Sequence, residues 1–180
     1  MALELKVVEG RIRRAYELGR LRRAAIRSLP LGAIAASAIY FGPQRSFDFA
    51  LGLSFVATAI FYLWQGQYAA RSLKPSVIAG LFPLVLSLIV NRSHPACGHE
   101  SMLSACTIAC ALGGVIAATR IIQFSRTQKH PSTAYGLALI PTVLLGSLGC
   151  GCIGFTGVLA MSIAIIVVSI PAMFVWVFSR

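Results

Sequence analysis

Long apolar stretches, separated by short polar breaks, make up nearly all of the chain after Arg27. They span residues 28–41, 47–64, 75–90, 102–124 and 133–178. A membrane-spanning helix needs about 20 predominantly apolar residues, and the last stretch is roughly twice that length. Near its middle, the segment Gly149-Cys150-Gly151-Cys152 predicts a tight turn between two helices. The pattern therefore predicts an all-α, polytopic integral membrane protein with about six transmembrane helices.

Composition excludes the other main classes of protein. Hydrophobic residues make up 57% of the 180 residues and charged residues only 12%, with a mean hydropathy of +0.80. A soluble domain carries about 25% charged residues, so neither a soluble globule nor a disordered chain fits. The net charge of +11 would suit nucleic acid, but half of the 16 Lys and Arg residues lie within the first 27 positions. That clustering is typical of a lipid-facing cytoplasmic end, so nucleic acid is not expected as a direct partner.

The first 27 residues form a segment of a different kind, which we treat as a domain preceding the membrane domain of residues 28–180. Leu5, Val8, Ile12 and Tyr16 recur at helical spacing among many arginines, a pattern that predicts a basic amphipathic helix. Such a helix can lie on an anionic lipid surface or bind a protein partner. The candidate partner-binding residues are Ile12, Arg13, Arg14, Tyr16, Leu18, Leu21, Arg22 and Arg23.

The distribution of Lys and Arg predicts the topology. If six helices span the membrane with the amino terminus inside, 14 of the 16 basic residues fall on the inner side. Only Arg45 and Arg92 remain outside. Because inner loops of membrane proteins are enriched in Lys and Arg, we expect both termini to be cytoplasmic, in a bacterial inner (cytoplasmic) membrane.

The apolar stretches contain few groups that could move ions or carry out catalysis. Asp48 is the one Asp, Glu, Lys or His within them, which argues against an ion-coupled carrier. No phosphate loop, hydrolase elbow or paired carboxylates occur, and the five acidic residues leave few candidates for acid–base catalysis. The chain is therefore not expected to be an enzyme.

Cysteine and histidine residues gather toward the predicted outer side. The candidate metal-binding or redox residues are His94, Cys97, His99, Cys106, Cys110, Cys150 and Cys152. Three interpretations remain open: disulfides formed in an oxidising compartment, thiols acting as small packing groups, and a site for zinc or copper. The spacing matches no standard zinc motif, and ligands on different helices cannot be paired from sequence.

Part of the chain resembles a known family. The residues that carry the resemblance are Lys74-Pro75, Ala79-Gly80, Pro83, His94, Cys97, Gly113-Gly114 and Arg120. Together they cover about residues 74–126, and this stretch resembles the NrsF-type six-span membrane anti-sigma factors. The resemblance implies an inner-membrane protein that holds a sigma factor at its cytoplasmic face and releases it on an envelope signal. The outer Cys/His loop would then be a candidate sensor.

These observations lead to three functional hypotheses. The first is a regulatory or sensory membrane protein of the anti-sigma type, with the lipid bilayer and a cytoplasmic sigma factor as partners. The second is a protein that binds or transports a soft metal ion such as copper, mercury or zinc, because thiols lie at helix ends. The third is a structural membrane subunit without a small ligand.

Overall fold

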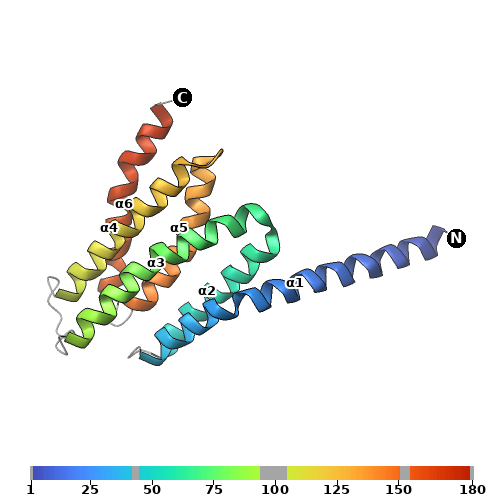
Figure 1. Ribbon diagram of the computed structural model, residues 1–180, viewed down its shortest axis with the longest axis horizontal. Helices are drawn as coiled ribbons and strands as arrows, with labels where there is room; N and C mark the ends of the chain where they lie inside the picture. Colours follow the sequence, from blue (N-terminus) through green and yellow to red (C-terminus); the bar gives the residue numbers. More distant parts are fainter. Residues whose placement is uncertain (1, 42–44, 94–104, 151–154, 179–180) are drawn as a thin grey trace.

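The computed structural model describes residues 2–41, 45–93, 105–150 and 155–178, and these residues form six helices without any strand (Figure 1). In chain order the helices are α1 Ala2–Phe41, α2 Arg45–Gln65, α3 Gln67–Ser93, α4 Ala105–Arg126, α5 Pro131–Cys150 and α6 Phe155–Phe178. The prediction of an all-α chain is confirmed. Helices suit an apolar medium because they satisfy nearly all their backbone hydrogen bonds internally.

Within the described parts of the chain, four helices are long and apolar enough to cross a membrane. They contain the segments Ser46–Gln65, Tyr68–Val90, Thr107–Arg126 and Pro131–Cys150. In α6 the described apolar segment, Thr156–Ala172, is shorter. The chain thus has the helices of a membrane protein, and four of the six predicted spans meet the length requirement.

The first predicted span is not a separate helix. Residues 28–41 form the end of α1, which is 40 residues long and continues without a break through Arg27 and Pro30. The predicted boundary at residue 27 is therefore a change of composition within one helix. A run of basic residues does not interrupt backbone hydrogen bonding, since Arg is a good helix former.

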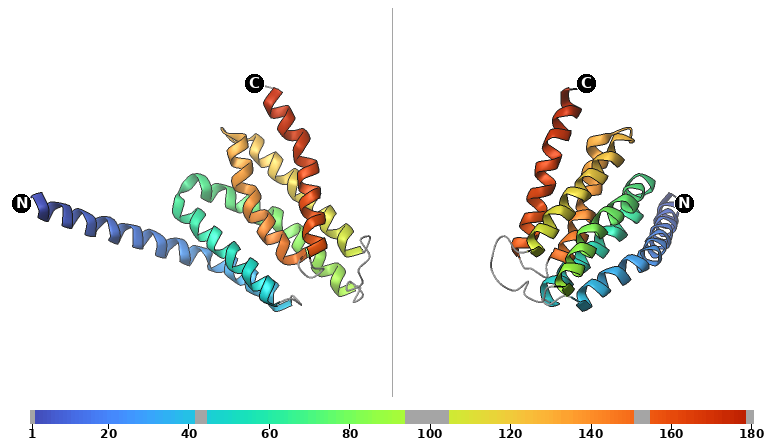
Figure 2. Two further views of the ribbon diagram at one scale, coloured as in Figure 1. Left: turned by 180° about the vertical axis from the view of Figure 1, so that it is seen from behind. Right: turned by 60° about the vertical axis from the view of Figure 1, so that its left-hand side comes forward.

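The carboxy-terminal four helices form a bundle, and α1 and α2 form a pair beside it (Figure 2). α3 packs extensively against α4 and α5, while α6 packs mainly on α4 and α1 mainly on α2. The pair is joined to the bundle through a cluster that includes Ala38, Phe55, Leu84 and Leu145. The amino-terminal half of α1 projects away from all the other helices (Figure 1).

Glycines allow α3 to approach its neighbours closely around Pro83. A Cβ atom added to Gly113 of α4 would lie 2.6 Å from the Pro83 Cα atom. One added to Gly149 of α5 would lie 2.5 Å from the Leu84 Cα atom. Small residues at helix interfaces let backbones come together in this way. Gly113 and Gly149 therefore serve packing within the chain.

The turns α2–α3 and α4–α5 lie at the same end of the molecule. Gly66 alone separates α2 from α3, and its φ of 127° belongs to the region that glycine adopts most readily. In the other turn, the His130 carbonyl accepts a hydrogen bond from the Ala134 amide (3.0 Å). The Tyr68 hydroxyl donates to that same carbonyl at 3.5 Å and so connects the two turns. Both breaks fall where the sequence predicts them.

The close contact at Pro83 gives a stability prediction. Gly113→Ala should lower the free energy of unfolding by about 1–3 kcal/mol, because overpacking forces backbones apart. Gly136→Ala is the matched control, since a Cβ there would meet nothing within 4 Å. Thermal unfolding in detergent, followed by circular dichroism, compares the two. Equal stability of both variants would show that the α3–α4 contact is not tight.

Candidate functional site

The projecting half of α1 exposes apolar side chains that no other described helix covers. Ile12, Tyr16 and Leu18 are each about two-thirds exposed, at 65%, 64% and 66%. Six arginines lie among residues 11–23, and they are too many to bury against the apolar bundle. The helix is therefore kept away from the bundle while its apolar residues remain accessible to another molecule.

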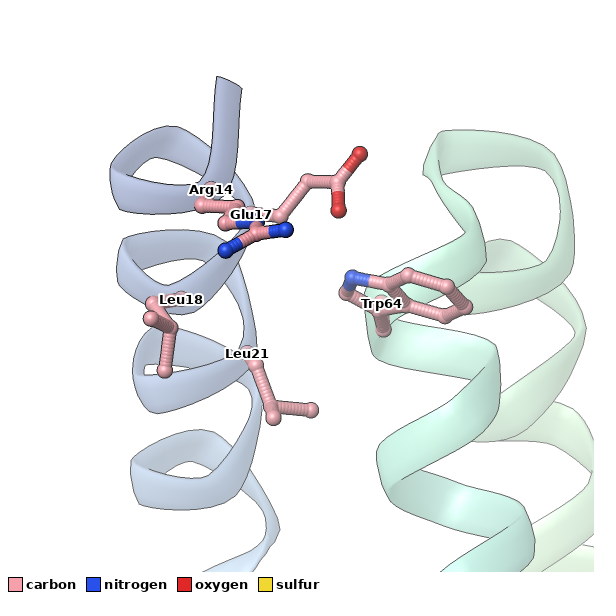
Figure 3. Close-up of a pocket in the computed structure, with 5 residues that line it drawn as sticks. All are labelled: Arg14, Glu17, Leu18, Leu21 and Trp64. Carbon is pink, nitrogen blue, oxygen red and sulfur yellow. The ribbon is translucent and has the colours of Figure 1, made fainter. Parts of the chain in front are cut away.

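One groove lies between this part of α1 and the end of α2, and we call it the Trp64 groove (Figure 3). Its volume is about 390 Å³, and its lining residues are Arg14, Glu17, Leu18, Leu21 and Trp64. Figure 3 shows Leu21 extending toward the Trp64 side of the groove, with Arg14 and Glu17 nearer one end. The Arg13 guanidinium contacts Glu17 at 3.3 Å, so this carboxylate is already paired. The groove can accept an apolar side chain next to a positive charge.

A second pocket lies between α1 and the α2–α3 turn, and we call it the arginine pocket. Its volume is about 270 Å³. It is lined by Tyr16, Arg20, Arg23, Ala24, Arg27, Leu63, Gly66 and Ala70. Three of these eight residues are arginines from one face of α1, so the lining is strongly positive.

The eight predicted partner-binding residues therefore do not form a single surface. Arg14, Leu18 and Leu21 line the Trp64 groove, whereas Tyr16 and Arg23 line the arginine pocket. The remaining three, Ile12, Arg13 and Arg22, are exposed and line neither.

Sequence reasoning missed the contribution of Trp64. In the sequence, Trp64 is the last residue of the apolar stretch 47–64, a position typical of an aromatic residue at the membrane interface. The predicted topology places the end of α2 and the basic part of α1 on the same side of the membrane. This was the one feature of the sequence that pointed to Trp64 as a neighbour of α1. The groove arises from the angle between the two helices, and no pattern in the sequence predicts that angle.

The structure places only part of the Cys/His set. His94, Cys97, His99 and Cys152 lie outside the described residues, and Cys106 lies in the first turn of α4. Among the described residues, no group of three His, Cys, Asp or Glu side chains could hold a metal ion. The predicted metal site as a whole therefore stays a prediction.

Two cysteines whose side chains are described are buried, and both belong to one core cluster with a methionine. Cys110 of α4, Cys150 of α5 and Met161 of α6 are all fully buried in it. The Cys150 and Met161 sulfur atoms are 4.0 Å apart. Three helices thus contribute sulfur atoms to this cluster, and Met161 was absent from the predicted set. The packing interpretation suits these two cysteines, because thiols and thioethers pack well against apolar groups.

Hydroxyl groups form hydrogen bonds between helices in the interior of the bundle. The Thr142 hydroxyl of α5 donates to the Ser76 carbonyl of α3 at 3.0 Å, and the Tyr135 and Ser169 hydroxyls bond to each other. Asp48, at the start of α2, is the one charged residue that is buried among the side chains described. The polar groups of the interior are thus mainly hydroxyls, which hold helices together.

Burial of Cys110 predicts chemical protection. A variant that keeps Cys110 as its single cysteine should resist alkylation by N-ethylmaleimide while folded and react fully in denaturant, because buried apolar thiols are inert. Intact mass spectrometry counts the adducts. Introducing Thr127→Cys, at an exposed turn position, into a background with all native cysteines replaced supplies a reactive control. Rapid labelling of folded Cys110 would contradict the α4–α5–α6 packing.

Comparison with known proteins finds no relative of this chain. No protein-family profile, no curated protein sequence and no solved structure matches the chain.

Proposed function

We propose that the chain is a non-enzymatic regulatory or sensory protein of the bacterial inner membrane that holds a cytosolic partner protein on α1. The partner implied by the family resemblance is a sigma factor, so the protein would act as a membrane anti-sigma factor. The observation that carries this proposal is the Trp64 groove. It combines exposed apolar side chains with a positive charge, on the part of α1 that leaves the bundle.

Charge supports a cytoplasmic position for this surface. The turns α2–α3 and α4–α5 lie at the end of the bundle toward which the basic residues gather, and Arg71, Lys74, Arg126 and Lys129 are all exposed. Lys and Arg are enriched in cytoplasmic segments of membrane proteins. Both termini are therefore proposed to be cytoplasmic.

The chemistry of the groove indicates the kind of partner surface. An apolar side chain that enters between Leu21 and Trp64 would leave water, and burying one such side chain contributes about 1.5–3 kcal/mol. Arg14 at the groove and the other exposed arginines of α1 favour an acidic surface around that side chain. The partner is thus an acidic protein surface with one protruding apolar residue.

Leu21→Asp tests this function. The substitution should weaken partner binding at least about tenfold, because it removes an apolar contact and adds a charge that repels an acidic partner. Ile12→Asp is the matched control, since Ile12 is exposed on α1 but lines neither the Trp64 groove nor the arginine pocket. The measurement is the amount of sigma factor that co-purifies with the tagged, detergent-solubilised protein, quantified by mass spectrometry.

A truncation lacking residues 1–27 should retain no sigma factor. Retention by the truncated protein, or equal loss in the Leu21→Asp and Ile12→Asp variants, would rule out the Trp64 groove as the binding surface. Absence of any sigma factor from the wild-type preparation would rule out the anti-sigma function itself.

A second candidate function, soft-metal binding, is favoured by the cluster of Cys110, Cys150 and Met161. Thiolate and thioether sulfur are ligands that copper(I) prefers. If this function is correct, protein loaded with copper(I) should retain metal through gel filtration, and Met161→Leu should release it with little change in packing volume. Inductively coupled plasma mass spectrometry measures the copper content of each variant and so tests this function. Equal copper in the wild type and in a Cys110→Ala/Cys150→Ala variant would exclude this site.

A further inference from the structure

We infer that the arginine pocket binds a phosphate group, and that the headgroup of an anionic phospholipid supplies it. This inference goes beyond partner binding, because the pocket and the Trp64 groove share no lining residue. Arg20, Arg23 and Arg27 are spaced by three and four residues, so they lie on one face of α1. All three line a single pocket of about 270 Å³.

Among the side chains that the structure describes, no acidic one lines this pocket. Glu17 lines the Trp64 groove and pairs with Arg13, while Asp48 is at the opposite end of α2 from the turn. Three guanidinium groups on one face repel each other, and an anion bound between them would relieve that repulsion. Arginine also suits phosphate in particular, because its planar donors match two phosphate oxygens at once.

The α2–α3 turn adds backbone groups to the same pocket. α3 begins at Gln67, immediately after Gly66, and both Gly66 and Ala70 line the pocket. The first turn of a helix presents amide groups and a partial positive charge that favour anions. The turn also brings Arg20 close: a Cβ atom on Gly66 would lie only 3.2 Å from Arg20 Nη2. Glycine at this position therefore leaves room for the guanidinium beside the start of α3.

The position of the pocket favours a lipid as the source of the phosphate. The apolar segment of α2 ends at Gln65, and the half-exposed aromatic residues Trp64 and Tyr68 flank the turn. Aromatic residues of this kind mark the level of lipid headgroups. Leu63 and Ala24 give the pocket an apolar wall, and α1 continues from it with exposed Ile26 and Leu29. A lipid can thus place its phosphate on the arginines and its glycerol and acyl chains along this wall.

The test compares two double variants that lose the same charge. Arg20→Gln/Arg27→Gln removes two arginines of the pocket, whereas Arg11→Gln/Arg22→Gln removes two exposed arginines that do not line it. The full chain in an uncharged detergent is titrated with phosphatidylglycerol, with phosphatidylcholine and with inorganic phosphate. The rise in Tm reports binding, and far-ultraviolet circular dichroism without lipid verifies that each variant is folded.

We expect phosphatidylglycerol to raise the Tm of the wild type and of Arg11→Gln/Arg22→Gln alike, at the same lipid concentrations. The Arg20→Gln/Arg27→Gln variant should need at least about tenfold more lipid, because charge-assisted hydrogen bonds are lost. Equal weakening of both variants would overturn the site in favour of diffuse attraction of α1 to anionic lipid. A Tm rise with inorganic phosphate alone, lost in Arg20→Gln/Arg27→Gln, would support the phosphate site but overturn the lipid as its source.

A third variant distinguishes the contribution of the guanidinium donor geometry to phosphate binding from the contribution of net charge. Arg20→Lys/Arg27→Lys keeps the net charge but loses the paired donors of each guanidinium. A phosphate site requires weaker binding of phosphatidylglycerol by this variant than by the wild type. Unchanged binding would overturn the proposed guanidinium–phosphate contact, whether or not the glutamine variant is stable.

Discussion

The close approach of α3 to α4 and α5 determines how the rest of the molecule is arranged. In an apolar medium helices gain little from leaving the solvent, so they associate through close packing and a few polar contacts. Gly113 and Gly149 permit backbone contact with Pro83 and Leu84, and Thr142 adds a hydrogen bond to the α3 backbone. With α3 held between these neighbours, α6 packs on α4, and the α1–α2 pair occupies the other side.

Charge determines the position of α1, as packing determines that of α3. The carboxy-terminal part of α1 is apolar and packs on α2. The part rich in arginine would have to bury charged side chains in order to pack in the same way. One continuous helix therefore has two environments. Where α1 separates from α2 it leaves spaces on two of its sides, and these are the Trp64 groove and the arginine pocket.

The sequence predicts the helices well because their ends are marked locally. Gly66 and Pro131 mark breaks, since these residues have distinct backbone preferences. It does not predict the continuity of α1 through Arg27, because a change from basic to apolar residues carries no stop signal. Nor does it predict which side chains meet across helices. Trp64 and Leu21 line one groove because of the angle at which α2 crosses α1, and no local pattern encodes that angle. Of the candidate site, the exposed residues of α1 were found from sequence, but their division between two surfaces was not.

The uninterrupted course of α1 has a mechanical consequence. A helix rises 1.5 Å per residue, so the projecting half of α1 forms a stiff arm of roughly 30 Å. A small rotation of the part of α1 that packs on α2 is magnified along this arm, and about 10° would displace the tip by roughly 5 Å. The same rotation alters the separation between Leu21 and Trp64 nearer the pivot. The helix can thus carry a movement of its packed part to its projecting part, without any flexible linker between the two.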